Sequence, residues 1–178
     1  MSHSRRTALR AAGVALLSSW AGCSALSHDS AESEDVTFER LDVTPVYVED
    51  GAELSTPAEV ETVDQAYNAE LLVLSGNTDA TSNQAVEWLA DDRIVALLGD
   101  SPEATWLEWA RSDAFRDTFS NEGYSDAEPD PSLVVGARIG LYLKTYRRSW
   151  SDGPRNRDVL RALDESLVAI EKETPPGE

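Results

Sequence analysis

Two short runs of the chain are almost entirely apolar, Leu71–Ser75 and Ile94–Leu98. The first is followed by Gly76 and the second by Gly99, and glycine favours a turn at these positions. A brief continuous apolar run that ends at a turn residue is typical of a strand buried on both faces of a sheet. We therefore expect two central strands here.

Further strands are indicated by weaker patterns. The run Val43–Val48 contains a proline. Proline is tolerated in an edge strand or at the start of a strand, so we expect one of these two positions. Leu133–Ala137 is apolar, and Tyr142–Trp150 continues as a second strand or hairpin arm with alternating side chains. The stretch between the first two strands has two interpretations. The Thr56-Pro57 pair could open a helix, but we favour a brief strand at Val60–Val63.

Amphipathic segments between these runs predict three helices. Thr81 and Gln84 have the spacing of a capping box before the first helix. Ser101 precedes Pro102 at the start of the second helix, and the third spans about Arg157–Glu171. The apolar faces predicted for these helices are Ala85, Val86, Leu89 and Ala90; Leu107, Ala110 and Ala114; and Leu160, Leu163, Leu167 and Ile170. We interpret the helical tryptophans as core residues: Trp88, Trp106 and Trp109.

The alternation of strands and helices with short turns predicts an α/β fold, with a mostly parallel sheet and helices on both faces. The segment 71–101 resembles part of a class I glutamine amidotransferase-like domain, a family with a three-layer flavodoxin-like architecture. In that family a nucleophile lies on the turn after such a strand. Here the turn carries Ser101, with Glu103 where a glycine is expected, and no histidine follows. The resemblance therefore implies the fold and not the activity, and we interpret Ser101 as a helix N-cap.

The first residues of the chain have the pattern of an export signal. A basic region with the pair Arg5-Arg6 precedes an apolar run, Ala11–Trp20, which is too short to span a membrane. The run leads into small residues before Cys23, the single cysteine. This pattern resembles a twin-arginine signal ending in the lipobox of a haloarchaeal lipoprotein. The resemblance implies lipidation of Cys23 and attachment to the outer face of the cell membrane. The alternative is an ordinary thiol within an uncleaved anchor.

The amino-acid composition agrees with a haloarchaeal origin. The chain has 33 acidic and 15 basic residues, and only Lys144 and Lys172 are lysines. Acidity with scarce lysine is typical of proteins from salt-loving archaea. In 1 M salt the Debye length falls to about 3 Å, so the like charges of such a surface hardly repel one another. An acidic disordered chain is the alternative, but 41% hydrophobic residues and five tryptophans argue against it.

The pattern divides the chain into four segments. Residues 1–22 are the expected twin-arginine signal peptide, and residues 23–37 are the lipidated cysteine and a flexible acidic tether. Residues 38–173 are expected to form a single α/β domain, and 174–178 a polar tail.

Several kinds of chemistry are missing from the expected domain. The two histidines, His3 and His28, precede it, and Cys23 is used by the anchor, so no histidine relay or Cys/His metal site is expected. No phosphate-binding loop or dinucleotide motif occurs, and we expect no cofactor. The loop 121–131 lacks EF-hand spacing, and we interpret it as a solvated acidic loop that could alternatively bind calcium through Asp126, Glu128 and Asp130.

One cluster of residues does suggest binding. Basic and aromatic side chains gather near the C-terminal end, in a segment that we call the basic stripe: Arg138, Lys144, Arg147, Arg148, Arg155, Arg157 and Arg161, with Tyr142, Tyr146 and Trp150. Arginine forks can hold carboxylates or phosphates, so we expect an acidic envelope protein or an anionic ligand. The alternative is that these cations pair with acids of their own domain. Nucleic acid is not expected, because counterion release contributes little in molar salt.

Together these patterns predict a non-catalytic, lipid-anchored extracytoplasmic module that binds a partner or ligand. The alternative is a hydrolase of the glycoside hydrolase type that uses carboxylates alone. Such an enzyme needs two carboxylates about 5 to 10 Å apart in a cleft. No pair of acids stands out in the sequence.

Overall fold

The computed structural model describes residues 37–119 and 130–174. The predictions for Arg5, Arg6, Cys23 and the segment 1–36 lie outside the described residues. The same holds for the acidic loop up to residue 129 and for residues 175–178.

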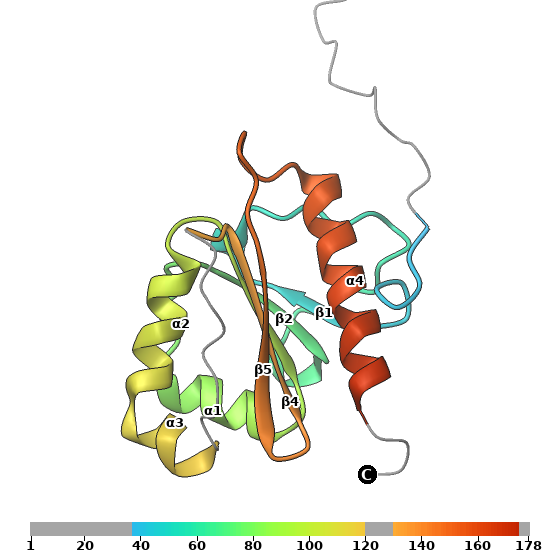
Figure 1. Cartoon of the computed structure of the whole chain (residues 1–178). Coiled ribbons are helices and arrows are strands. Elements are labelled where there is room, and N and C mark those ends of the chain that lie inside the picture. Colours follow the sequence, from blue (N-terminus) through green and yellow to red (C-terminus); the bar gives the residue numbers. More distant parts are fainter. Residues whose placement is uncertain (1–36, 120–129, 175–178) are drawn as a thin grey trace, which may run out of the picture. The chain divides into compact units, whose positions relative to one another are not determined.

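The described residues contain a five-stranded sheet (Figure 1). Its strands lie in the order of the sequence: β1 (Val46–Val48), β2 (Leu71–Ser75), β3 (Ile94–Leu98), β4 (Leu133–Ile139) and β5 (Tyr142–Arg148). Strands β1, β2 and β3 are parallel, and β4 runs antiparallel to both β3 and β5. Four of the five strands therefore point the same way, which confirms the mostly parallel sheet. The consecutive order differs from the 2-1-3-4-5 order of flavodoxin-like sheets, and that finer prediction is not confirmed.

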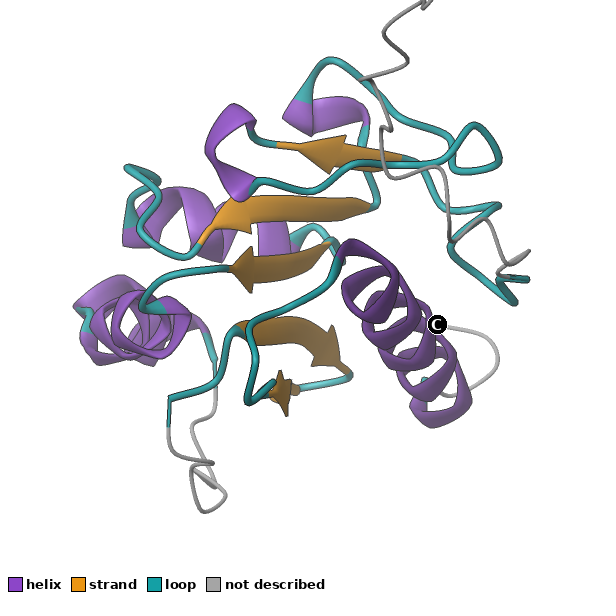
Figure 2. Ribbon diagram, turned by 90° about the horizontal axis from the view of Figure 1, so that it is seen from above, coloured by secondary structure: helices purple, strands orange, loops and turns teal. Residues whose placement is uncertain are grey.

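Helices pack against both faces of this sheet (Figure 2), as predicted. Three of them pack on one face: α1 (Ser82–Ala90), α2 (Pro102–Arg111) and α3 (Asp113–Thr118). The opposite face is covered by α4 (Asn156–Glu173). Two short 3-10 helices, η1 (Asp50–Ala52) and η2 (Ala66–Asn68), lie between β1 and β2.

The central strands are apolar at every position except Ser75, because both of their faces are covered. In β2, Leu71 and Val73 pack toward α4, whereas Leu72 and Leu74 pack toward the other helices. All four side chains are at most 2% exposed. Burying a leucine or valine side chain contributes about 1.5 to 3 kcal/mol, so each continuous run supplies both halves of the core at once.

Tryptophans of α2 fill the core beneath the first three helices. Trp106 and Trp109 are buried, as predicted, and Trp88 of α1 packs partly buried against the same cluster. Trp106 lies directly over Gly136 of β4, where a Cβ atom would come within 2.0 Å of the indole ring. Its ring also meets Phe115 edge-on, with the two ring centroids 5.9 Å apart. This close approach of helix to strand therefore requires a glycine at position 136.

The helix starts were predicted with mixed success. The capping box is confirmed, because the Thr81 hydroxyl accepts the Gln84 backbone N–H and the Gln84 side chain accepts that of Thr81. Ser101 does occupy the N-cap position of α2, but its hydroxyl makes no capping hydrogen bond. The reason is its backbone, which has φ of 59° instead of the extended conformation that aims an N-cap side chain at the helix.

The second predicted helix is in fact two helices. Helix α2 ends at Arg111, and the Ser112 hydroxyl accepts the Phe115 backbone N–H to begin α3. The change of direction brings Phe115 into the core and leaves Leu107 and Ala114 only half-buried. The apolar face predicted for one continuous helix was therefore partly wrong.

The remaining boundaries lie close to those predicted. Strand β1 begins at Val46, after the proline, and β5 ends at Arg148, two residues earlier than expected. Thr62 forms a single parallel bridge with Val46, so the segment Val60–Val63 does lie along β1. The last helix, α4, extends slightly beyond Arg157–Glu171 at both ends, and its four predicted apolar residues are all buried.

A buried carboxylate fastens the first described residues to α4. One oxygen of Asp164 accepts the backbone N–H groups of Arg40 and Leu41 at 2.8 and 2.9 Å. The Glu39 N–H lies 3.1 Å from the same oxygen. Asp164 is only 8% exposed, so these hydrogen bonds satisfy a charge that would otherwise be costly inside the protein.

Candidate functional site

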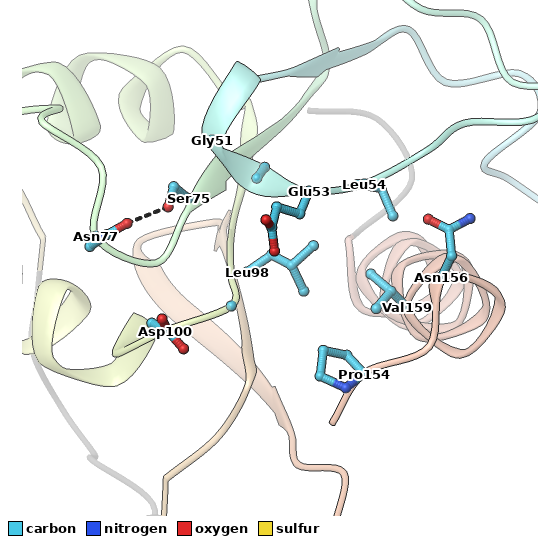
Figure 3. A pocket seen from close by; sticks show the side chains of 12 residues that line it. Gly51, Glu53, Leu54, Ser75, Asn77, Leu98, Asp100, Pro154, Asn156 and Val159 are labelled. Atoms are coloured by element: carbon cyan, nitrogen blue, oxygen red, sulfur yellow. Dashed lines mark hydrogen bonds between the residues drawn. The ribbon is translucent and has the colours of Figure 1, made fainter. Parts of the chain in front are cut away.

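A pocket of about 310 Å³ opens at the carboxyl ends of the parallel strands (Figure 3). Strands β1, β2 and β3 all end at this edge of the sheet, and α4 begins there. In open α/β sheets ligands bind in the crevice outside the carboxyl ends of the strands, at a point where the strand order reverses. The described sheet has a consecutive strand order, and its pocket shares with those sites the position at the carboxyl ends of parallel strands.

Four segments line the pocket. They are the end of η1 with the loop after it, the turns that follow β2 and β3, and the start of α4. The lining residues are Gly51, Ala52, Glu53, Leu54, Ser75, Asn77, Leu98, Gly99, Asp100, Pro154, Asn156 and Val159.

The lining has a polar side and an apolar side (Figure 3). Ser75, Asn77 and Asp100 lie together on the side of β2 and β3, where the Ser75 hydroxyl is hydrogen-bonded to the Asn77 side chain. Val159 and Pro154, with Leu54 above them, form the other side. A ligand that fills the pocket would meet hydrogen-bonding groups on the side of β2 and β3, and hydrocarbon with the Asn156 amide on the side of α4.

The turns around the pocket are held by specific hydrogen bonds. The Glu49 carboxylate accepts the Ser75 backbone N–H and the Thr78 hydroxyl, both at 2.8 Å. The Asn156 side chain bonds both the backbone N–H and the carbonyl of Ser55, each at 2.8 Å, which ties the loop after η1 to α4. The pocket walls are therefore fixed before any ligand arrives, which reduces the entropic cost of binding.

Close packing of the two turns also shapes the polar side. The Gly76 N–H donates to the carbonyl of Leu98 at 2.6 Å. A Cβ atom at residue 76 would lie 2.3 Å from the backbone oxygen of Asp100. The turn after β2 can therefore approach the turn after β3 only because residue 76 is glycine.

Unusual backbone conformations occur along the same edge. Glu53, which lines the pocket, has φ of 47°, and Ser101 follows the pocket residue Asp100 with φ of 59°. A non-glycine residue in such a conformation costs of order 1 to 3 kcal/mol, and residues of this kind cluster at functional sites. The Glu53 side chain extends toward Leu98 (Figure 3).

All ionised groups that line the pocket are acidic. They are the carboxylates of Glu53 and Asp100. Within the described residues neither carboxylate makes an ion pair or a side-chain hydrogen bond. Both residues are exposed at the mouth of the pocket and can be reached by a ligand.

The sequence prediction did not find this pocket. Its residues are spread between positions 51 and 159 and form no motif. The signal that was present is positional, because Asn77 and Asp100 each follow the glycine after a predicted buried strand. Polar residues just beyond the carboxyl ends of parallel strands are candidates for ligand contacts.

The structure divides the basic stripe between the two faces of the sheet. On the α4 face, Lys144 pairs with Glu173 of α4, and Arg148 lies 3.5 Å from Glu165. Tyr146 and Trp150 pack partly buried against the core on this face.

On the opposite face, Arg138 pairs with Asp92 at 2.7 Å and Arg147 pairs with Glu103 of α2 at 2.9 Å. The Arg147 side chain is only 8% exposed and also donates to the Thr145 hydroxyl.

Four cations of the stripe therefore pair with acids of their own domain, as the alternative interpretation expected. Arg157 also interacts with a neighbouring group, whereas Arg155 and Arg161 form no ion pair with another described residue. Tyr142 is 57% exposed next to the β4–β5 turn. Partner binding by the stripe stays a prediction.

Two groups of the stripe have shifted pKa values. The hydrogen bond to Glu173 raises the pKa of Lys144, and burial raises the pKa of Tyr146. Both shifts move titration further from neutral pH. Lys144 and Tyr146 therefore do not serve as acid or base near pH 7.

We found no candidate metal site or catalytic histidine in residues 37–119 and 130–174. These ranges contain no histidine or cysteine, and their acidic residues form no group of three or more that could hold a metal ion. None of the helices described is both long and apolar enough to cross a membrane.

Comparisons with known proteins were negative. No family model, curated protein or solved structure matches the chain. The geometry of the pocket is therefore the basis for a functional proposal.

Proposed function

We propose that this chain is a non-catalytic binding protein that holds a small ligand in the pocket at the carboxyl ends of β1, β2 and β3. The observation that carries this proposal is the position of a preformed, two-sided pocket at the usual ligand site of a parallel sheet. Most of the lining is polar, and polar groups of this kind fix the orientation of a ligand in a small-molecule site.

The volume limits the ligand to a small molecule. A pocket of about 310 Å³ lies at the lower end of the range for ligand sites. At about 30 Å³ for each water-sized group, it has room for roughly ten non-hydrogen atoms. A pocket of this size suits a small molecule or a small group of a larger one.

Binding is favoured over hydrolysis by the surroundings of the two pocket carboxylates. A glycosidase places its paired acids in a cleft that encloses the substrate. Glu53 and Asp100 are instead exposed to solvent. The described residues also contain no histidine or cysteine to serve as base or nucleophile.

The same proposal places the protein on the outer face of the cell membrane, held by a lipid on Cys23. Support comes from the sequence alone: the Arg5-Arg6 pair, the short apolar run and the small residues before a single cysteine. We expect Cys23→Ser to release the protein from the membrane fraction into the medium, because the thioether-linked lipid cannot form. Retention of the variant on membranes would argue against the lipid.

We also propose that the domain is related to flavodoxin-like folds. The mostly parallel sheet with helices on both faces supports it. The consecutive strand order is the feature against it.

Pocket binding can be tested with a library of fragments of about ten non-hydrogen atoms. Asn77→Trp places an indole at the polar side of the pocket, whereas Asn83→Trp adds the same group to an exposed position of α1. We expect ligand-detected NMR to find fragments that bind the wild-type chain and Asn83→Trp but not Asn77→Trp. A library in which no fragment distinguishes these two variants would contradict the proposal.

A further inference from the structure

The charge of the pocket limits the chemistry of its ligand. The pocket is lined by the carboxylates of Glu53 and Asp100 and by no lysine, arginine or histidine. Basic side chains elsewhere in the described chain are used differently, as Arg147 is held by Glu103 and Arg138 by Asp92. An anionic ligand would therefore face like charges with no cation to offset them, which is unfavourable. A cationic group would instead face opposite charges.

The apolar side of the pocket separates an organic cation from a metal ion. In the view of Figure 3, Leu98 lies below Glu53 and between Asp100 and Val159. A hydrated metal ion gains nothing from contact with such a wall, whereas the hydrocarbon part of an organic cation can be buried against it. In agreement, the described acidic residues form no group suited to hold a metal ion.

We infer that the ligand is a small organic cation, an amine or ammonium compound with a short apolar part. This inference rests on the proposed function, because it names the ligand class of the same pocket. The charged end lies by Glu53 and Asp100, and the apolar end lies against Leu54, Pro154 and Val159.

High salt does not remove this selectivity. In 1 M salt the Debye length is about 3 Å, so distant charges are screened while a pair in direct contact still interacts. Selectivity then depends on the two carboxylates that the ligand touches and not on the large negative charge of the whole chain. A substitution that removes the charge of Glu53 or Asp100 is expected to weaken binding. Removal of a carboxylate charge elsewhere on the surface is not.

Three probes of nearly equal size and different charge test the inference: benzylammonium, benzyl alcohol and benzoate. Calorimetric titrations of the full chain at one fixed molar concentration of KCl measure the affinity for each. We expect benzylammonium to bind at least about tenfold more tightly than benzyl alcohol, and benzoate to bind weakest; tenfold corresponds to about 1.4 kcal/mol.

Variants then locate the charge effect. Glu53→Gln and Asp100→Asn are each expected to weaken benzylammonium binding by about two- to fivefold and to leave benzyl alcohol unchanged. Glu87→Gln on the exposed surface of α1 is the matched control and is expected to bind like the wild type.

The outcomes separate this inference from the proposed function. If all three probes bind equally and Asn77→Trp abolishes their binding, the pocket is confirmed and the organic cation is ruled out. If benzylammonium does not bind, or binds without loss in Glu53→Gln and Asp100→Asn, the inference is overturned. If Asn77→Trp binds every probe as the wild type does, the pocket itself is refuted.

Discussion

The Asp164 carboxylate offers the clearest test of what holds the first described residues against the core. It accepts backbone N–H groups from Glu39, Arg40 and Leu41, which lie more than 120 positions earlier in the chain. Asp164→Ala removes this acceptor from a site that is only 8% exposed. Glu165→Ala is the matched control, because this next acid of α4 is exposed and lies 3.5 Å from Arg148.

The structure sets the size of the effect. A hydrogen bond to a charged group contributes about 1.5 to 3 kcal/mol, and a buried donor left without an acceptor costs about 1 to 3 kcal/mol. The Leu41 N–H is buried and would lose its acceptor, whereas the Glu39 and Arg40 groups are nearer to solvent and can bind water. We therefore expect Asp164→Ala to lower the free energy of unfolding by about 3 kcal/mol. Glu165→Ala should lower it by less than about 0.5 kcal/mol.

Urea unfolding at constant molar KCl, followed by tryptophan fluorescence, measures both differences. Because the Asp164 contacts are buried, the loss should be nearly the same at 1 M and 3 M KCl. A loss below about 1 kcal/mol for Asp164→Ala, or one equal to that of Glu165→Ala, would refute the role assigned to this carboxylate.

Two further predictions concern packing and the basic stripe. Gly136→Ala should lower the free energy of unfolding by about 1 to 3 kcal/mol or more, because the new Cβ would meet the Trp106 ring; an unchanged thermal midpoint would contradict this. Arg147→Ala should cost about 3 kcal/mol because it leaves the largely buried Glu103 unpaired, whereas Arg148→Ala should cost less than about 0.5 kcal/mol. Equal losses of unfolding free energy for these two arginine variants would show that burial does not distinguish the pairs.

The sequence predicted the elements whose burial is uniform. Leu71–Ser75 and Ile94–Leu98 are found at the predicted residues, because a strand covered on both faces is apolar throughout. The break between α2 and α3 was not predicted, since it depends on Ser112 capping a new turn within an apparently continuous amphipathic pattern. The left-handed conformation of Ser101 was also missed, because it follows from how the turn after β3 packs and not from the residue type.

The candidate site was harder to predict than the fold. The basic stripe was conspicuous in the sequence because its residues are close together along the chain. Strand geometry places Lys144 and Arg147 on opposite faces of β5, where each pairs with an acid of a different helix. The pocket was hidden for the opposite reason, since Glu53, Asp100 and Val159 come together only in three dimensions.

Amide chemical-shift mapping of the full chain, with the tightest-binding fragment from the library, tests most directly whether the pocket binds a ligand. We expect the largest shifts on the pocket residues Gly51, Ser75, Asn77, Gly99 and Asp100, and we expect these shifts to be absent in Asn77→Trp. Largest shifts along β5, or shifts of equal size over the whole surface, would contradict the claim that this pocket is the binding site.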